Sequence, residues 1–455
     1  MTLTIQNPAT EAILRELEED TADTVREKAH RARAARHEWA LTPLERRIAM
    51  LKTFRDSIER DKERLAAVMT SEVGKPIAQG RNELGGLLGR IDFFLAETEA
   101  TIASETVFSD SSMTERIEHA PLGVIANISA WNYPYFVGAN VFVPALLTGN
   151  TVLYKPSEYA TLTGLAIAEL LHAAGIPNDV FVPVVGGGAV GAALLEQAID
   201  GVFFTGSYQT GRKVGEAAGR RMLHVQLELG GKDPAYVADD VDVAAAAAGT
   251  ADGAFYNTGQ SCCAVERIYV HERIYDSFVE AFTSEVKRFV IGDPTDDKTY
   301  IGPLTRKPQL EVLAAQVADA RSRGGNVVVG GSRIDRKGFY FEPTVITNVD
   351  HSMAVMKDES FGPIIGIQRV SGDNEAQALM NDTEYGLTAA VYSRDRGRAE
   401  HILGGVEAGT TYWNCCDRVS PRLPWSGRGH SGLGLTLSKY GILTFTRPKA
   451  WHLRA

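Results

Sequence analysis

The sequence has few cysteines. Four occur in 455 residues, as the adjacent pairs Cys262-Cys263 and Cys415-Cys416. Neighbouring residues rarely reach disulfide geometry, so these cysteines cannot form the disulfide framework of a small secreted protein. No CxxC or HxxxH spacing occurs, and we therefore expect no metal site. A reducing compartment, the cytoplasm, is the expected location.

The chain also lacks a long uninterrupted apolar run. Its most apolar stretch, residues 121–149, is broken by asparagines and prolines, unlike the roughly 20 lipid-facing residues of a membrane span. The first residues show no basic segment followed by an apolar core, so we expect no secretory signal. Acidic residues outnumber basic ones by 57 to 47. This balance argues against nucleic-acid and anionic-membrane partners, and we expect a soluble protein acting on a small molecule.

The pattern of elements indicates an α/β protein of two or three domains. The first hundred residues look helical, and Thr42-Pro43-Leu44-Glu45 is typical of a capping box at a helix start. From residue 121, and again after Gly230, short apolar runs alternate with helical segments, which predicts parallel sheets covered by helices. The predicted strands are 124–129, 151–154, 180–185, 202–205 and 225–229, then 268–270, 327–329, 364–369, 389–393 and 410–413.

Two glycine-containing turns are candidates for phosphate or nucleotide binding. Gly186-x-Gly188-x-x-Gly191 follows an apolar run and precedes a helical one, as a dinucleotide fingerprint does, but no acidic residue ends a strand about 20 residues on. It is either a cofactor loop or a simple glycine turn. In Phe204-Thr205-Gly206-Ser207 a strand leads into a helix, whose free amides favour a phosphate. Alternatively, Ser207 only caps that helix.

Three further residues have the chemistry of a catalytic site. Cys262 follows Gly259-Gln260-Ser261 ahead of a β-rich stretch, and is either an exposed nucleophile or a buried inert thiol. Glu228 lies within an apolar run, where burial would raise its pKa towards that of a general base, unless it faces solvent from an edge strand. Glu359 is an acidic residue in a loop, which is usually only a solvated charge.

Seven motifs occur in order along the chain: Trp131-Asn132-Tyr133-Pro134, Lys155-Pro156-Ser157-Glu158, Phe204-Thr205-Gly206-Ser207, Glu228-Leu229-Gly230-Gly231, Gly259-Gln260-Ser261-Cys262, Glu359-x-Phe361-Gly362-Pro363, and Pro424-Trp425-Ser426-Gly427 with Ser431-Gly432. Together they resemble the aldehyde dehydrogenase superfamily over essentially the whole chain. The length is similar to that of short bacterial members labelled succinate-semialdehyde or aldehyde dehydrogenases. The resemblance implies two Rossmann-like parallel-sheet domains, one for the cofactor and one for catalysis, and a small β oligomerisation element.

The resemblance also implies a role for each matched residue. Cys262 is the nucleophile, with Cys263 as an inert neighbour, and the Asn132 side chain and the Cys262 N–H donate to the thiohemiacetal oxyanion. Glu228 activates water to hydrolyse the thioester once hydride has gone to the nicotinamide. The residues implied to bind the cofactor are Lys155, Ser157 and Glu158 near the adenine ribose, Gly206, Ser207 and Gly211 along the pyrophosphate, Glu359 at the nicotinamide ribose, and Trp131, Leu229 and Phe361. The Gly186–Gly191 turn then lies near the adenine.

Glu158 bears on the choice of cofactor. A carboxylate at this position can accept a hydrogen bond from the ribose 2′-hydroxyl and repels a 2′-phosphate. We therefore predict a preference for NAD over NADP.

The substrate is predicted from departures from the resemblance. Members specific for succinate semialdehyde place arginines nine residues after the motif tryptophan and directly before the asparagine of the cysteine motif. Here these positions are Asn140 and Tyr256. The predicted pocket residues are Tyr133, Tyr135, Tyr256 and Trp425, with Trp413 as a further candidate. An aromatic pocket of this kind suits a medium-chain, aromatic or amino aldehyde.

Other functions remain as alternatives. Arg418 and Arg422 lie in a loop that could reach a carboxylate, which keeps succinate semialdehyde as the alternative substrate. Glu228 favours water as the acyl acceptor and so disfavours a CoA-acylating enzyme. A non-catalytic binding protein is disfavoured because Cys262, Asn132 and Glu228 are all present.

The domain boundaries are also implied by the resemblance. They are 1–103 and 121–229 for the cofactor domain, 230–428 for the catalytic domain, and 104–120 with 429–455 for oligomerisation. We expect a homodimer or a dimer of dimers, with residues 101–120 as a protruding hairpin and the β-prone stretch 441–451 paired with another element.

Overall fold

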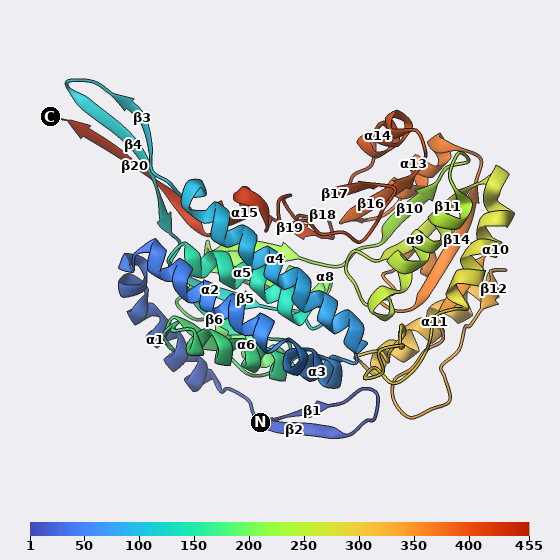
Figure 1. Cartoon of the computed structure of the whole chain (residues 1–455), viewed down its shortest axis with the longest axis horizontal. Coiled ribbons are helices and arrows are strands. Elements are labelled where there is room, and N and C mark those ends of the chain that lie inside the picture. Colours follow the sequence, from blue (N-terminus) through green and yellow to red (C-terminus); the bar gives the residue numbers. More distant parts are fainter. Residues whose placement is uncertain (455) are drawn as a thin grey trace.

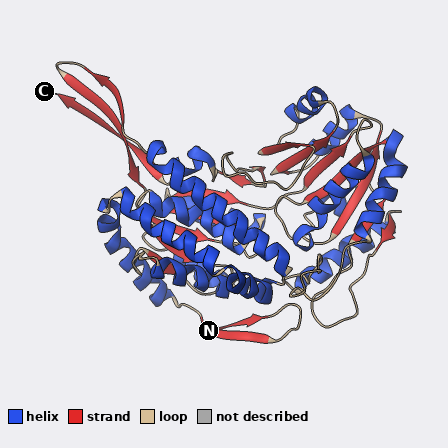
Figure 2. Ribbon diagram, viewed as in Figure 1, coloured by secondary structure: helices blue, strands red, loops and turns tan. Residues whose placement is uncertain are grey.

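The computed structural model describes residues 1–454 and has two α/β lobes and an extended β arm (Figure 1). The secondary-structure view shows helices covering the sheet of each lobe, while the arm consists of strands alone (Figure 2). The α/β fold with two parallel-type sheets and a small antiparallel sheet confirms the predicted fold class.

The first lobe contains a six-stranded sheet in the order β19-β9-β8-β5-β6-β7, in which only β19 is antiparallel. The strands are β5 (Val124–Ile128), β6 (Thr151–Lys155), β7 (Phe181–Pro183), β8 (Gly201–Thr205), β9 (His224–Glu228) and β19 (Gly432–Leu433). The helices are α1 (Ala22–Leu41), α2 (Leu44–Arg60), α3 (Lys62–Val73), α4 (Ile77–Thr101), α5 (Pro134–Leu147), α6 (Thr161–Ala173), α7 (Gly188–Leu195), α8 (Tyr208–Arg220) and α15 (Ser438–Leu443). All five strands predicted here occur, within two residues at each end.

The second lobe contains a seven-stranded sheet in the order β12-β13-β14-β11-β10-β16-β17, in which only β12 is antiparallel. The strands are β10 (Asp233–Val237), β11 (Val265–His271), β12 (Asn326–Val329), β13 (Thr344–Thr347), β14 (Ile364–Val370), β16 (Thr388–Tyr392) and β17 (Thr410–Trp413). The helices are α9 (Val243–Phe255), α10 (Tyr275–Val286), α11 (Pro308–Ser322), α12 (Ala354–Lys357), α13 (Asp373–Asn381) and α14 (Arg396–Gly404), with the 3₁₀ turns η1 (Tyr256–Gly259) and η2 (Glu272–Ile274). The predicted strands are present, but β10 and β13 were not expected.

The arm consists of β3 (Glu105–Ser109), β4 (Met113–Pro121) and the C-terminal strand β20 (Thr446–Arg454), all antiparallel (Figure 1). This confirms the predicted hairpin. Of the C-terminal stretch 441–451, the part from Thr446 pairs as predicted, whereas residues 441–443 lie in α15. Two small antiparallel pairs complete the described chain: β1 (Thr2–Gln6) with β2 (Ile13–Glu18), and β15 (Tyr385–Gly386) with β18 (Arg428–Gly429). Because β19 joins the first sheet, part of the predicted oligomerisation tail lies within that lobe.

The predicted capping box is wrong. The Thr42 hydroxyl donates to the Glu38 carbonyl oxygen at the end of α1, and α2 begins at Leu44 with Pro43 in the cap position and no side-chain cap. Among the described residues, no helix is both long and apolar enough to cross a membrane.

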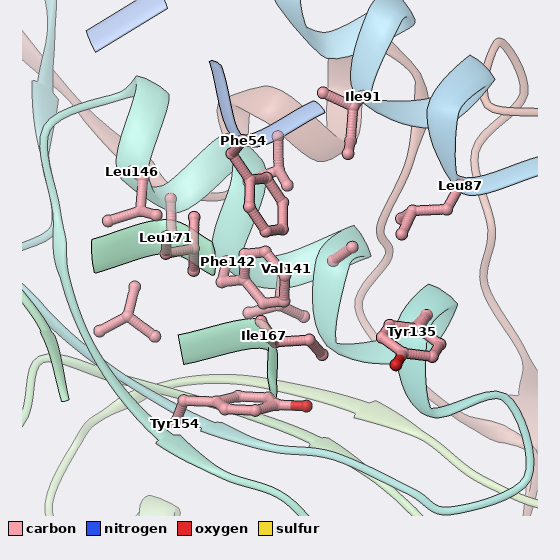
Figure 3. Packing of buried hydrophobic residues seen from close by; sticks show 14 of the residues in the cluster. Phe54, Leu87, Ile91, Tyr135, Val141, Phe142, Leu146, Tyr154, Ile167 and Leu171 are labelled. Carbon is pink, nitrogen blue, oxygen red and sulfur yellow. The ribbon is translucent and has the colours of Figure 1, made fainter. Parts of the chain in front are cut away.

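The hydrophobic core of the first lobe fixes α5, whose N-terminus carries site residues. The Phe142 ring of α5 lies edge-on to the rings of Phe54 and Tyr154, with centroids 6.1 and 5.7 Å away, and aliphatic side chains of α2, α4 and α6 surround it (Figure 3). Burying apolar surface stabilises a fold by about 25 cal/mol per Å², so this large cluster holds α5 firmly against the neighbouring helices. The loop between β5 and α5 is therefore held at a fixed place above the sheet.

Candidate active site

Cys262 lies in the loop between η1 and β11, and the backbone just before it is strained. Asn257, Thr258 and Gly259 have φ values of 54°, 58° and 69°, all in the left-handed region. Glycine adopts this conformation freely, but asparagine tolerates it less well and threonine least, because its side chain is branched at Cβ. Such strain persists only where the surroundings over-determine the conformation.

Hydrogen bonds from both lobes hold this loop. The Asn257 backbone N–H donates to Gln79 Oε1 of α4 at 2.9 Å, and Asn257 Nδ2 donates to the carbonyl oxygen of Asn132 at 3.1 Å. The Thr305 N–H donates to Gln260 Oε1 at 2.9 Å. The cysteine loop is therefore tied to α4 and to the loop that carries Asn132.

Cys262 is partly exposed and lines two cavities. The first, of about 480 Å³, also contains Glu228, Tyr133, Tyr256 and Trp425. The second cavity contains other residues predicted to bind the cofactor or to take part in catalysis. Thr205 lines both cavities. The predicted residues in the second cavity are Trp131, Asn132, Gly206, Ser207, Leu229, Glu359 and Phe361. The thiol therefore sits where the two cavities meet.

Asn132 is buried, with 4% of its surface exposed, and lines the second cavity beside Cys262. Its backbone carbonyl accepts from Asn257, but its side-chain amide makes no hydrogen bond within residues 1–454. Buried polar groups are normally satisfied, so this amide is free for a ligand. It fits a donor to an oxyanion formed on Cys262.

Glu228 ends β9 and is 7% exposed. Burial raises the pKa of Glu228 to about 7, against the hydrogen bond donated by Thr436 and the positive charge of Arg90, which both lower it. A carboxylate with a pKa near neutrality can take a proton from water and return it. The structure thus brings the predicted base into the same cavity as Cys262.

Glu359 lies in the second cavity, in a loop fixed by a buried ion pair. Lys232 Nζ lies 2.6 Å from Glu266, whose carboxylate also accepts from the N–H groups of Ser360 and Phe361. Burial raises the pKa of Glu359 to about 7, helped by the negative charge of Glu266. The Phe361 ring meets Trp131 edge-on, with centroids 5.5 Å apart.

A third cavity continues the second along the first sheet, and Thr205, Gly206 and Ser207 line both. Its other predicted residues are Trp131, Lys155, Ser157, Glu158, Gly188 and Gly191. Ser207 caps α8 by accepting from the Thr210 N–H at 3.4 Å, so this residue both caps the helix and faces the cavity. Burial lowers the pKa of Lys155.

The run of cavities fits an elongated dinucleotide. It is lined in turn by a lysine and a carboxylate (Lys155 and Glu158), the N-terminus of a helix, and a second carboxylate (Glu359) near the thiol. Helix N-termini favour phosphate groups. Gly211 differs from its prediction, because it lines none of these cavities and instead gives α8 room to pack against Leu229.

The prediction for the substrate pocket is wrong at Tyr135. Its ring is buried in the core, and its hydroxyl donates to the Leu65 carbonyl oxygen at 3.1 Å. Tyr133 lies just before α5 and Tyr135 lies within its first turn, so the two side chains point in different directions. Trp413 is outside the pocket too; its indole N–H donates to the Ser393 carbonyl oxygen.

Several charged residues in or beside the first cavity were not identified from the sequence. Lys75 pairs with Glu83, and its ammonium lies 3.7 Å from the centre of the Tyr133 ring. Asp417 accepts from the Cys263 thiol at 2.9 Å, and contact with Cys262 and burial together raise the pKa of Cys263 well above its usual value. Cys263 therefore stays a neutral thiol.

Arg90 of α4 is the most informative residue missed. It occupies the buried stripe formed by Leu87, Ile91 and Phe94, where a charged side chain is unusual. This break in the apolar pattern of α4 could have identified Arg90 as a functional residue from the sequence alone. The side chain lines the first cavity.

The comparisons with known proteins agree with the motifs. Residues 1–451 match the model of the "Aldehyde dehydrogenase family". The chain is 35% identical to peroxisomal aminoaldehyde dehydrogenase 2 of Malus domestica, over 96% of this chain and 90% of that protein. It is 35% identical to the succinate-semialdehyde dehydrogenase [NADP(+)] of Deinococcus radiodurans, over 92% and 88%. The solved structure of betaine aldehyde dehydrogenase from Staphylococcus aureus in complex with NAD+ has a TM-score of 0.96 at 30% identity, covering 100% of this chain and 94% of that one.

Proposed function

The chain belongs to the aldehyde dehydrogenase family, and we propose that it oxidises an aldehyde to its carboxylic acid through a covalent intermediate on Cys262. The observation that carries this proposal is the position of Cys262, which lines both the aromatic cavity and the cavity that leads to the dinucleotide cradle. Lys155, Glu158, Ser207 and Glu359 of that cradle would hold a nicotinamide dinucleotide, which would supply the hydride acceptor when bound.

The first step is attack of the Cys262 thiolate on the aldehyde carbonyl. The carbon–sulfur bond forms and the carbonyl oxygen becomes an oxyanion. The free amide of Asn132 is the donor placed to stabilise that charge, and donors of this type contribute roughly 10²–10³ in rate. Loss of hydride from the same carbon leaves a thioester on Cys262.

The second step is hydrolysis of the thioester. Glu228 takes a proton from water, the hydroxide adds to the acyl carbon, and the carbon–sulfur bond breaks to release the acid and the Cys262 thiolate. A pKa of about 7 suits this role, because the group is ionised in part at neutral pH and remains basic enough to accept a proton. Water as acyl acceptor distinguishes this reaction from a CoA-acylating one.

For the cofactor, we propose that NAD is preferred over NADP. Glu158 lines the third cavity two residues after Pro156, and a carboxylate there favours a free 2′-hydroxyl over a 2′-phosphate. The exposed Lys213 lines the same cavity and weakens this discrimination without supplying a buried phosphate site.

For the substrate, the sequence favours a medium-chain, aromatic or amino aldehyde, with succinate semialdehyde as the alternative. Tyr133, Tyr256 and Trp425 support an apolar pocket. The alternative gains support from a specific observation, the buried guanidinium of Arg90 in the same cavity.

We also propose that the arm mediates self-association into a dimer or a dimer of dimers. Its outer strand β3 is exposed along its length, with Val107 and Phe108 exposed by 56% and 42%. Exposed apolar side chains on an edge strand are normally covered in an assembly. We also propose the domain division predicted from the sequence, with the change that β19 and α15 of the predicted oligomerisation tail belong to the first lobe.

The reaction is tested by following absorbance at 340 nm with purified protein, NAD⁺ or NADP⁺, and a panel of hexanal, phenylacetaldehyde, betaine aldehyde and succinate semialdehyde. We expect turnover in the wild type and none with Cys262→Ala. Cys263→Ala is the matched control and should retain turnover. Activity that survives in Cys262→Ala would contradict the proposal.

A further inference from the structure

Arg90 is a buried cation without an anionic partner. Its side chain lines the cavity that holds Cys262 and Glu228, and only 6% of its surface is exposed. It forms no ion pair within residues 1–454. Its single hydrogen bond runs from Nη1 to Asn140 Oδ1 at 2.9 Å, and its guanidinium lies 3.8 Å from the centre of the Phe136 ring.

Not every deeply buried cation of this protein is satisfied: Arg47 and Lys155, like Arg90, form no ion pair within residues 1–454, whereas two others are fully partnered. Lys232 pairs with Glu266, and Arg267 donates to three backbone carbonyls and to the Tyr269 hydroxyl. A buried charge is costly unless it is paired and hydrogen-bonded. What distinguishes Arg90 is its place: it lines the cavity of Cys262 and Glu228, whereas Lys155 lines the third cavity and Arg47 lines none of the three. A ligand in the Cys262 cavity is therefore the partner available to Arg90.

The contacts of Arg90 fix its orientation and leave donors free. Asn140 holds Nη1 and the Phe136 ring packs against the guanidinium plane, whereas Nε and Nη2 bond to no other group in the described chain. A guanidinium held in this way presents a fork that matches a carboxylate in two parallel hydrogen bonds.

The cavity around Arg90 has a positive balance. Glu83 is neutralised by Lys75 and also accepts from the backbone N–H of Tyr135. Arg418 and Arg422 line the same cavity and are exposed. The remaining acidic residues of the cavity are Asp417, which accepts from the Cys263 thiol, and Glu228, whose negative charge raises the pKa of Arg90. Burial lowers the pKa of Arg90 to about 10, so its side chain remains protonated at neutral pH.

A cationic substrate finds less support in this cavity. The rings of Tyr133 and Phe136 lie nearly parallel, 13° apart, and each already has a cation of the protein, Lys75 or Arg90, over one face. An ammonium group placed there would approach both cations. Tyr256 and Trp425 remain as its only other aromatic neighbours among the predicted pocket residues.

We propose that Arg90 binds the carboxylate of the substrate, and that the substrate class is a short aldehyde with a carboxylate at its far end, of which succinate semialdehyde is an example. This inference rests on the proposed function. The aldehyde carbon would then lie at Cys262 and the carboxylate at Arg90, both in the 480 Å³ cavity.

The test compares kcat/KM for succinate semialdehyde, pentanal and 4-aminobutanal in the wild type, Arg90→Met and Arg90→Lys. We expect the wild type to prefer succinate semialdehyde, and Arg90→Met to lower the ratio of its kcat/KM to that of pentanal by about 10–100-fold, mainly through KM. Arg90→Lys should recover only part of it, because an ammonium lacks the fork. Arg394→Met, which removes an exposed arginine that lines none of the three cavities, is the matched control and should leave the ratio within about twofold.

The ratio separates carboxylate binding from a general effect of Arg90 on Glu228. A general effect would lower kcat equally for both aldehydes and leave the ratio unchanged, which would overturn the inference, as would a wild-type preference for pentanal or 4-aminobutanal. A protein that oxidises none of the three would contradict the proposed function instead. A second measurement tests the carboxylate site without turnover and needs no variant, so it also serves if Arg90→Met does not fold. Succinate should protect Cys262 from alkylation by iodoacetamide. Protection supports the inference, and its absence overturns it.

Discussion

The hydrogen bond from Thr436 to Glu228 makes a quantitative prediction about the pH dependence of the reaction. The hydroxyl donates to Oε1 of the ionised carboxylate and so lowers the pKa of a group that burial raises to about 7. Replacing Thr436 by valine preserves the shape of the buried side chain but removes the donor. The carboxylate of Glu228 is then harder to ionise.

The magnitude follows from the value of such a bond. A hydrogen bond to a charged group contributes about 1.5–3 kcal/mol, which corresponds to roughly one to two pKa units. In Thr436→Val the pKa of Glu228 should therefore rise to about 8–9. At pH 7 the ionised fraction falls from about one half to between about 1 and 10%, and hydrolysis slows by about 5–50-fold.

The assay is the pH profile of kcat with a substrate whose deacylation limits turnover, identified by a burst of NADH before the steady state. The wild type should lose activity as pH falls through about 7, because Glu228 becomes protonated. In Thr436→Val the same fall in kcat should occur at higher pH, and kcat should recover in alkaline solution. The profile of Thr436→Ser should stay close to that of the wild type. An unchanged midpoint in Thr436→Val, or a uniform loss at every pH, would refute the reasoning.

Three further predictions concern single side chains. Asn132→Ala removes the free amide beside Cys262 and should lower kcat by about 10²–10³ with little change in NAD binding, measured by steady-state kinetics and by cofactor titration. Glu158→Ser should raise kcat/KM for NADP⁺ relative to NAD⁺, and a wild type that already uses NADP⁺ at least as well contradicts the proposed preference. The folded-state pKa of Glu228 is raised, so its protonated form stabilises the fold below the unfolded pKa, and this contribution is lost as pH rises through about 7. Glu228→Gln should therefore gain about 2 kcal/mol of stability relative to the wild type between pH 5 and pH 8.5, measured by denaturant unfolding; no pH dependence of this difference would contradict the raised pKa.

The strands of both sheets could be predicted where an apolar run ends in a clear turn. The run Thr410–Trp413 is found with the predicted bounds, and the five strands of the first sheet differ by at most two residues at an end. β10 was missed because Asp233 and Pro234 open it, and proline argues against a central strand. Pro234 is the second residue of β10, and all five residues of the strand are buried. Packing in the core therefore outweighs the local preference of proline against a central strand.

The candidate site was predictable only where residues belong to a motif. Cys262, Glu228 and Asn132 are adjacent to glycines or other motif residues, and the fold brings them to one pair of cavities. Arg90 lies about 40 residues before the first motif, and only the packing of α4 against α5 carries it to Asn140. The error at Tyr135 has the same origin, because neighbouring residues at a helix start face different sides and the sequence does not say which side meets the cavity.

The central claim, covalent catalysis at Cys262 with hydrolysis by Glu228, is tested most directly in the Glu228→Gln variant. Mixed rapidly with NAD⁺ and an aldehyde substrate, it should release about one NADH per subunit at 340 nm and then stop, since general-base catalysis typically contributes about 10²–10⁴ in rate. Intact-protein mass spectrometry should then find the acyl group, and peptide mapping should place it on Cys262. Full turnover in this variant, or an acyl group on any other residue, would contradict the account.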